Sequence, residues 1–460
     1  MQQNILVYFR NDLRLHDHEP LYTADLAGAK VIGVYNFNPL HFSSHHLGFR
    51  KTGVFRAQFL IECVNDLRNK LQSVGSDLII THGNPLYTIP DLCKKLRITK
   101  VYAHAEHAPE ERMEELALEK LLYSEKIDFK LFHGNTLIQV SALPFGIHQT
   151  PLLFTDFRKA VEKKAEYRNV FPEVKALRNI EHHFLPETYT LERLGFTAEE
   201  IEGKLFLYKG GEKEALKRLH YYIWETKLVA SYKETRNHLL GMDFSSHFSP
   251  WLAAGCLSPS LILSEVRAFE LTRIKNDSTY WLIFELLWRD FFRFSMLRYG
   301  ASYFKTEGIR QQFINWSDND ILFNKWLNGE TGYPFIDANM KELKLTGFMS
   351  NRGRQNVASF LCKNLGINWL WGAAWFESAL VDYDVCSNYG NWAYLAGVGN
   401  DARLFRYFNI EKQADTYDKD ETFRKHWLEK DGYYDTGIKP VVDFEESIKL
   451  AEKKYMESLG

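Results

Sequence analysis

The sequence lacks the motifs of several common cofactor sites. No G-x-G-x-x-G follows its first apolar run, and no phosphate-binding loop occurs in its 460 residues, which excludes the usual nicotinamide and nucleoside triphosphate sites. Cysteine is scarce, and no two cysteines have the C-x-x-C spacing. We therefore expect no metal site, and free thiols in a reducing compartment, at Cys63, Cys93, Cys256, Cys362 and Cys386.

Long apolar runs and a strong net charge are missing as well. No stretch of 18 apolar residues occurs, and the apolar run in MQQNILVYFRNDLR is too short for a signal peptide. We expect a cytoplasmic protein that does not enter a membrane, with an organelle left open. The net charge of −2 limits any nucleic-acid site to a local groove, while the aromatic content of 15% favours ring-lined pockets.

The first 135 residues alternate short apolar runs with amphipathic stretches. This pattern predicts an α/β domain with a doubly wound parallel sheet. The expected strands are 5–9, 31–37, 77–83, 100–105 and 128–134, and the expected helices are 53–74, 85–97 and 110–126.

The rest of the chain divides into three predicted parts. Residues 136–211 contain several prolines and a Gly-Gly pair and indicate a long, irregular connector. Residues 212–430 have helical periodicity and predict an all-α domain. Residues 431–460 form a polar extension with one exposed helix over 443–458, which is either a partner-binding segment or a solvated end.

Two segments of the helical part suggest a ligand site. In SSHFSPWLAAGCLSPS (245–260), both Ser-Pro pairs predict an N-cap followed by a helix, and free N–H groups with nearby hydroxyls suit a pyrophosphate. In YWLIFELLWRDFFRF (280–294), Trp281, Glu285, Trp288 and Arg289 share a helix face, where a carboxylate beside an indole could bind a base. The alternatives are two capped helices and an ordinary core stripe with an i,i+4 ion pair.

Two further segments add polar groups. NRGRQNVASFL (351–361) places two arginines and two amides before an apolar helix. DYDVCSNYGNWAYLAGVGND (382–401) contains carboxylates, an amide and electron-rich rings without a cation. Asp382 and Asp384 lie two apart and need different partners, and one of them could pair with Arg354. A flat heterocycle that bears amide groups would suit this set.

These four segments, in this order and spacing, resemble the photolyase/cryptochrome family. The start, YFRNDLRLHDHEPL, is similar to the N-terminal signature of that family, and the resemblance extends over roughly residues 1–430. Within the family, the segments GGEKEALKRLHYYIWETKLVASYKETRNHLLG, FSSHFSPWLAAGCLSP and NRGRQNVASF are most similar to the cryptochrome-DASH group.

The resemblance implies a U-shaped FAD inside the helical domain. It places phosphates at Tyr232 and at Ser245, Ser246, His247, Phe248 and Ser249, and it places Trp281 and Arg289 along the cavity. Asn351 and Arg354 would lie against the flavin, with Arg354 paired to Asp382. Asp384 would accept from the flavin or its sugar, and Asn388 would face flavin N5 and steady its reduced or radical form.

The resemblance also implies an electron relay, a DNA surface and an antenna. The relay would run through Trp392, Trp369 and Trp316. Glu285 and Trp288 match residues that contact a cyclobutane pyrimidine dimer, and Arg236, Arg352, Gln355, Tyr394, Arg406 and Gln413 match positions near DNA. Glu106 matches a folate-binding acid, which implies 5,10-methenyltetrahydrofolate as antenna.

The implied function is light-driven repair of pyrimidine dimers by a monomer. Photolyases that act on duplex DNA have Trp and Met where this chain has Tyr394 and Gln355, and the DASH group shares this difference. We therefore expect a preference for single-stranded DNA, where the cost of flipping is lowest. A blue-light photoreceptor without repair and an electron-transfer flavoprotein remain alternatives, while the absence of a pair of pocket histidines argues against the 6-4 photoproduct.

Overall fold

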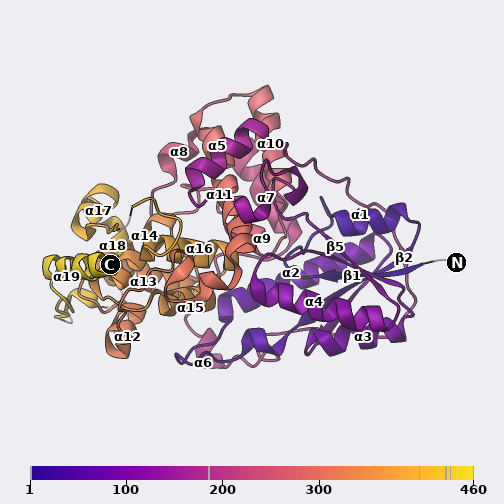
Figure 1. Ribbon diagram of the computed structural model, residues 1–460, viewed down its shortest axis with the longest axis horizontal. Helices are drawn as coiled ribbons and strands as arrows, with labels where there is room; N and C mark the ends of the chain where they lie inside the picture. The colour runs from indigo at the N-terminus through magenta and orange to yellow at the C-terminus, as the bar shows by residue number, and fades with distance from the viewer. Residues whose placement is uncertain (1–2, 185–186, 404, 430–431, 436, 459–460) are drawn as a thin grey trace.

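The computed structural model describes residues 3–184, 187–403, 405–429, 432–435 and 437–458. Figure 1 shows three regions: an α/β domain around the N-terminal strands, a body of helices that ends with α19, and a smaller helical lobe that contains α5, α8 and α10. Some positions of the predicted polar extension (431, 436 and 459–460) lie outside the described residues.

The α/β domain contains the predicted doubly wound parallel sheet. Its strand order is β3-β2-β1-β4-β5, and the short β6 pairs with the start of β2. The strands are β1 (Asn4–Phe9), β2 (Lys30–Phe37), β3 (Leu78–His82), β4 (Lys100–His104), β5 (Asp128–Phe132) and β6 (Arg178–Asn179). The central runs are apolar throughout because helices cover both faces.

The helices of this domain lie on opposite faces of the sheet. Successive residues of β1 enter two separate cores, one with α3 (Pro85–Lys95) and α4 (Pro109–Ser124) and the other with α1 (Glu19–Leu26) and α2 (Val54–Ser73). The expected strand and helix positions are confirmed to within a few residues. The helix α1 was missed, and His18 caps its N-terminus by accepting from Leu21 N at 3.2 Å.

The connector is more ordered than the sequence suggests. Within 136–211 it forms α5 (Phe154–Lys164) and the single-turn α6 (Ala198–Ile201). Phe154, Phe157 and Val161 are buried on one side of α5, at helical spacing, and α5 packs against α11. Its prolines concealed this short amphipathic pattern.

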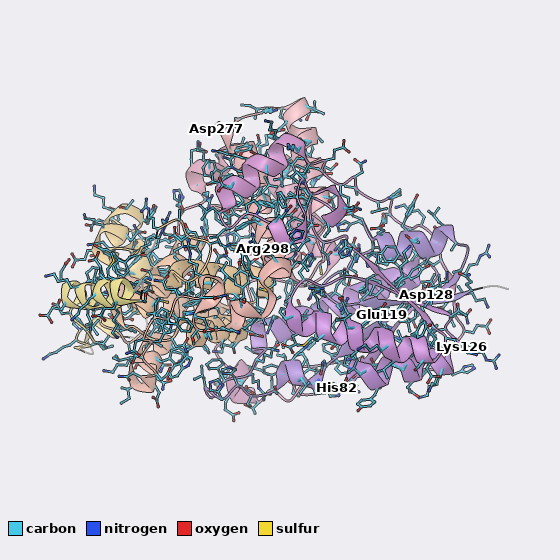
Figure 2. All side chains as sticks on the ribbon, viewed as in Figure 1. His82, Glu119, Lys126, Asp128, Asp277 and Arg298 are labelled. Atoms are coloured by element: carbon cyan, nitrogen blue, oxygen red, sulfur yellow. The ribbon has the colours of Figure 1, made fainter. Side chains whose placement is uncertain are left out.

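The helical domain contains the remaining elements. They are α7 (Glu212–His220), α8 (Tyr232–Thr235), α9 (Ser249–Ala253), α10 (Pro259–Thr272), α11 (Asp277–Tyr299), α12 (Asp320–Asn328), α13 (Pro334–Thr346), α14 (Asn351–Ser359), α15 (Trp369–Ala379), α16 (Val385–Ala396), α17 (Ile410–Tyr417), α18 (Thr422–Leu428) and α19 (Phe444–Glu457). In Figure 2, Asp277 marks the outer tip of the lobe and Arg298 the centre of the molecule, so α11 runs from the lobe to the middle of the fold.

Residues of the N-terminal signature connect the two domains through buried hydrogen bonds. The buried Glu212 carboxylate accepts from the backbone N–H groups of Leu15 and His16, each at 3.0 Å, from the His16 ring, and from Lys70 Nζ at 2.8 Å. The buried Arg14 donates to the carbonyl of Gly255 at 2.8 Å. Gly255 has φ +72° and lies so close to Asn11 that a Cβ atom would clash with its backbone.

The last helix is where the sequence predicts it, but one side of α19 is not exposed. Ile448, Ala451 and Tyr455 are buried against the helical domain, and the Tyr455 hydroxyl donates to the carbonyl of Ala396. Because Tyr455 also packs edge-on to Trp316 at 6.2 Å, this helix is part of the domain surface rather than a free tail.

The structure also bears on the predictions for the cysteines and for membrane-spanning helices. All five cysteines are buried free thiols. Across the described residues, we find no helix with both the length and the apolar character needed to cross a bilayer.

Candidate functional site

A cavity of about 300 Å³ lies in the helical domain between α8, α9, α11, α14 and α16. Its volume is at the lower end of the range for ligand pockets. Nearly every residue that the resemblance assigns to the cofactor lines it. These are Tyr232, Ser245, Ser246, His247, Phe248, Ser249, Arg289, Asn351, Arg354, Asp382, Asp384 and Asn388. Trp281 is not among them, and its ring stacks on Phe284 at 4.9 Å.

The run from Asp382 to Asp401 builds one wall of this cavity. Asp382 Oδ2 accepts from Arg354 Nη2 at 2.9 Å, which is the predicted pair. Asp384 caps α16 by accepting from Ser387 N at 2.9 Å and pairs with Arg293 at 2.8 Å. Burial alone would raise the pKa of Asp384, but the Arg293 charge and hydrogen bond hold it well below its usual range.

Asn388 lies one turn into α16 and is buried. Its Nδ2 donates to the carbonyl of Ala373 at 3.0 Å. This bond orients the amide and does not involve Oδ1. Arg293, which the sequence analysis did not select, lies one turn beyond Arg289 on α11. Its i,i+4 spacing from Arg289 was the signal that could have identified it.

Three buried polar atoms in the cavity wall have no hydrogen-bond partner among the described residues. They are His247 Nε2, Asp382 Oδ1 and Trp392 Nε1. An unsatisfied buried polar atom costs roughly 1–3 kcal/mol, so a ligand that pairs with these atoms would be favoured. A flat heterocycle with both donors and acceptors, such as the flavin of FAD, fits this requirement.

The helix starts near Ser245–Ser260 are partly as predicted. Ser258 caps α10 by accepting from Ser260 N and Leu261 N. Ser249 is not a cap, because it is the first residue of the short α9 and Phe248 precedes it without a side-chain bond. The amides and arginines of 351–356 lie within the first turns of α14, rather than before it, and Ser350 caps that helix.

Glu285 lines the cavity, but Trp288 is not among the lining residues. Glu285 forms an ion pair with Arg236, which also lines the cavity, instead of the i,i+4 pair with Arg289 of the alternative interpretation. Burial raises the pKa of Glu285, and Arg236 opposes this rise. The Trp288 ring stacks on Phe154 at 3.8 Å and lies edge-on to Tyr394 at 6.3 Å.

The other predicted DNA-binding residues are held by bonds within the protein. Arg352 donates to Gln355 Oε1 and Asn237 Oδ1, both at 3.0 Å, and lies over the ring of Tyr417. Arg406 pairs with Asp401 and lies 5.4 Å from the Tyr394 ring. Gln413 Oε1 accepts from Asn356 Nδ2 at 3.3 Å. Of this group, Gln355 and Arg236 line the cavity.

The three tryptophans of the expected relay lie on α16, at the start of α15 and in the segment before α12. Trp392 lines the cavity, Trp369 is fully buried and Trp316 is half-buried. The indole nitrogens of Trp369 and Trp316 both donate to the carbonyl of Thr306. Trp326, which the sequence analysis did not select, lies 6.2 Å from Trp392.

A second cavity, of about 610 Å³, lies between the two domains. It is lined by Glu106 and also by Tyr383 and Asp384, which line the first cavity as well. Glu106 accepts from Asn11 Nδ2 at 3.0 Å, and burial raises the pKa of its carboxyl. Burial and the charge of Glu106 raise the pKa of the nearby Glu111 to about 7.

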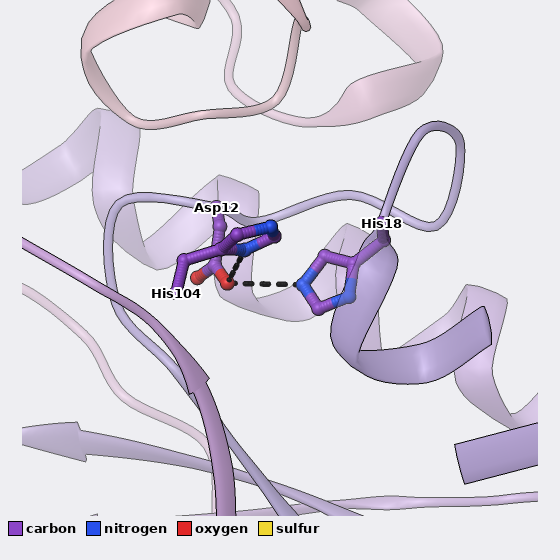
Figure 3. Close-up of side chains that lie close together, drawn as sticks. All are labelled: Asp12, His18 and His104. Carbon is purple, nitrogen blue, oxygen red and sulfur yellow. Dashed lines mark hydrogen bonds and ion pairs between the residues drawn. The ribbon is translucent and has the colours of Figure 1, made fainter. Parts of the chain in front are cut away.

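One buried cluster has the composition of a metal site. Asp12 Oδ2 lies 2.9 Å from His18 Nε2 and 2.7 Å from His104 Nδ1 (Figure 3). Because Leu21 N–H donates to His18 Nδ1, the His18 proton is on Nε2 and points at the carboxylate. The Nε2 lone pair that a metal would need is therefore absent, and the cluster is a hydrogen-bond network that joins Asp12 and His18 of the N-terminal signature to His104 of β4.

Comparison with known proteins shows which family has this architecture. A model of the FAD binding domain of DNA photolyase matches residues 281–455, and a model described as DNA photolyase matches residues 5–179. A cryptochrome DASH from Gloeobacter violaceus is 51% identical over 427 residues, which cover 93% of this chain and 85% of the relative. The chain belongs to the photolyase/cryptochrome family. Its main likeness is to the DASH type.

Further relatives and solved structures agree. A cryptochrome DASH from Danio rerio is 45% identical and covers 93% of this chain and 83% of the relative. The crystal structure of a Synechocystis cryptochrome has a TM-score of 0.92 at 45% identity, over 98% of this chain and 99% of that one. A class III photolyase from Agrobacterium tumefaciens has a TM-score of 0.86 at 27% identity, over 100% and 98%. The predicted family and fold class are confirmed.

Proposed function

We propose that this photolyase-type chain repairs cyclobutane pyrimidine dimers by light, preferentially in single-stranded DNA, with FAD in the cavity of its helical domain. The observation that carries the proposal is that Glu285 and three unpaired polar atoms line one cavity in a chain with an FAD-binding photolyase domain. When bound, reduced FAD supplies the photoexcited electron that splits the cyclobutane ring.

The side chains of the cavity bind and orient the cofactor in this proposal. Tyr232 and the segment Ser245–Ser249 hold the phosphates, and Arg289 adds positive charge beside them. Asn351, at the cavity rim, and the Arg354–Asp382 pair lie along the flavin. Asp384, fixed by Arg293, accepts a hydrogen bond from the flavin or its sugar. Asn388 presents its amide to flavin N5, because the bond from Nδ2 to Ala373 restrains its rotation.

The dimer contacts come from Glu285 and from the ring pair of Trp288 and Tyr394. Glu285 hydrogen-bonds the flipped dimer; burial raises the pKa of its carboxyl, and the ion pair with Arg236 opposes this rise. Trp288 lies outside the cavity lining with one ring face covered by Phe154, so in this proposal the dimer stacks on its other face, worth roughly 1–3 kcal/mol per base. Arg236, Arg352, Gln355, Arg406 and Gln413 contact the nucleotides around the lesion.

The preference for single strands rests on Tyr394 and Gln355. Extruding a dimer from a duplex costs a few kcal/mol of unstacking, and a smaller apolar pocket offsets less of that cost. The test is to illuminate the reduced protein with the same dimer-containing oligonucleotide in single-stranded and duplex form. Restored thymines in the single strand support the proposal, and faster repair in the duplex contradicts the preference.

A second candidate, a blue-light photoreceptor, is supported by the relay tryptophans. Trp392, Trp369 and Trp316 extend from the cavity wall to a half-buried position, which suits entry of electrons from outside. A protein that photoreduces its flavin through this relay but restores no thymines would be a photoreceptor of this kind.

We further propose that the cavity between the domains holds 5,10-methenyltetrahydrofolate as an antenna, with Glu106 pairing to its N–H groups. An archaeal photolyase from Sulfolobus tokodaii, with a TM-score of 0.79 at 25% identity over 99% of this chain and 100% of that one, is described with two FAD molecules and a novel light-harvesting cofactor. A near-UV absorption band that disappears in Glu106→Gln but persists in Glu119→Gln, on the exposed side of α4, would support the antenna.

The cellular setting is also a proposal. Five buried free thiols are consistent with a reducing compartment, so we propose a cytoplasmic monomer. A rice relative, 47% identical, is named chloroplastic/mitochondrial, which makes an organelle the alternative. Cell fractionation and sedimentation of the purified protein distinguish these cases.

A further inference from the structure

His247 has an unusual backbone and an unused ring nitrogen. Its φ is +53°, in the left-handed region that a residue with a side chain rarely adopts, so the surrounding structure must hold it there. Its side chain lines the cofactor cavity, is buried, and leaves Nε2 without a partner among the residues that the structure describes.

The other ring nitrogen of His247 is bound by a residue from the connector. Tyr208, between α6 and α7, places its hydroxyl 2.5 Å from His247 Nδ1. Tyr208 is itself buried, with its ring edge-on to Trp251 at 5.8 Å and tilted against Phe348 at 5.5 Å. Phe244 and Phe348 also contact the imidazole, each at 4.8 Å, so the ring cannot turn freely.

The donors and acceptors available to Tyr208 and His247 determine the direction of this hydrogen bond. A buried hydroxyl must donate its proton, and His247 Nδ1 is the one acceptor that the described residues offer to Tyr208. If Nδ1 carried the proton, the Tyr208 O–H would have no acceptor. The imidazole proton is therefore on Nε2. Burial and the charge of Arg218 lower the pKa of His247 to about 3, so the ring is neutral near pH 7.

We propose that Tyr208 is a positioning residue for the cofactor: it fixes the tautomer of His247 so that a permanent Nε2–H donor faces the cavity. This proposal rests on the proposed binding of FAD in that cavity. The donor requires an acceptor oxygen or ring nitrogen on the ligand, and it complements the unpaired acceptor Asp382 Oδ1 in the same wall. Tyr208 is not among the lining residues of the cavity and acts through His247.

The first test reads the tautomer without cofactor. The apo-protein is labelled with ¹⁵N-histidine, and the signals of His247 are assigned because they disappear in His247→Asn. The chemical shifts of its two ring nitrogens report which one is protonated. Asn is chosen because it tolerates a positive φ. We expect Nε2–H in the wild type and a mixture of tautomers in Tyr208→Phe. A wild-type ring protonated on Nδ1 overturns the proposal, and this outcome does not depend on whether the Phe variant folds.

The second test measures FAD affinity by reconstituting apo-protein. Tyr208→Phe should weaken binding by roughly 3- to 10-fold, the effect of one imperfectly made hydrogen bond. The matched control is Tyr221→Phe, which removes a hydroxyl that donates to Asp243 at 2.9 Å outside the cavity lining and should leave affinity unchanged. Equal affinity in all three proteins overturns the proposal. If the wild type itself does not bind FAD, the proposed function fails instead.

Discussion

The indole nitrogens of Trp369 and Trp316 donate to one carbonyl oxygen, that of Thr306, at 3.0 and 3.3 Å. A shared acceptor keeps the two rings side by side although they are 53 residues apart in the chain. We expect the pair to pass electrons between rings held at fixed separation.

The relay predicts that Trp316→Phe slows light-driven flavin reduction to a small fraction of the wild-type rate. The phenyl ring is harder to oxidise than an indole, so electrons no longer enter at the half-buried end. The measurement is flavin bleaching under blue light with an external reductant. Trp371→Phe is the control, because Trp371 lies on α15 but packs on Phe323. Equal bleaching in Trp316→Phe and wild type would exclude this route.

Glu285 is expected to matter for repair more than for cofactor binding. Glu285→Ala should lower dimer repair by roughly 10- to 100-fold, because a hydrogen bond from a charged or acidic group to the substrate is lost. FAD absorbance should be unchanged. Glu265→Gln, which alters a carboxylate that accepts from Trp224 Nε1 at 2.6 Å outside the cavity lining, serves as the control. Unaltered repair in the Ala variant would remove Glu285 from the mechanism.

Glu212 should determine part of the acid stability. Burial alone would raise its pKa, but bonds from His16 and Lys70 lower it from 4.5 to about 2. A lowered folded-state pKa contributes stability above pH 4.5 that is lost as the pH falls toward 2. Glu212→Gln should therefore cost about 3 kcal/mol at pH 7 and make unfolding less dependent on pH between 4.5 and 2. Urea unfolding across this range, with Glu214→Gln as control, is the measurement.

Lys363 should affect the stability of the protein at neutral to alkaline pH. It is buried, donates to the carbonyl of Ala396 at 2.9 Å and lies 3.5 Å from the Tyr455 ring centre. Burial lowers its pKa from 10.5 to about 7. The unfolded chain then binds more protons between these values, so stability rises with pH in that window. Relative to Lys363→Met, the wild type should gain about 2 kcal/mol between pH 7 and 9. Lys449→Met, on the exposed side of α19, should not alter the slope.

The fold was largely predictable because its signals are local. Five apolar runs and the helices between them have clear periods, so their positions agree with the structure to within a few residues. The helix α5 was missed because Pro144 and Pro151 suggested a loop where Phe154, Phe157 and Val161 form a short apolar stripe. The buried side of α19 was missed because its partners, Ala396 and Trp316, are distant in the sequence.

The candidate site was predictable as a set of residues but not as a geometry. The residues alone indicated that Asp382 or Asp384 could pair with Arg354, and the family resemblance selected Asp382, which is the partner in the structure. By contrast, spacing on α11 offered only Arg289 as an i,i+4 partner for Glu285, whereas tertiary packing brings Arg236 to it. Tyr208 was not selected because a single aromatic residue in a connector has no pattern, and only its contact with His247 gives it a role.

Tyr383 and Asp384 line both cavities, so ligands in the two cavities would share these two side chains. Binding in the two cavities would then be thermodynamically linked. The factor by which one ligand changes the affinity of the other must equal the factor by which the second ligand changes the affinity of the first. Titrating FAD with the neighbouring chamber filled and empty would measure that linkage.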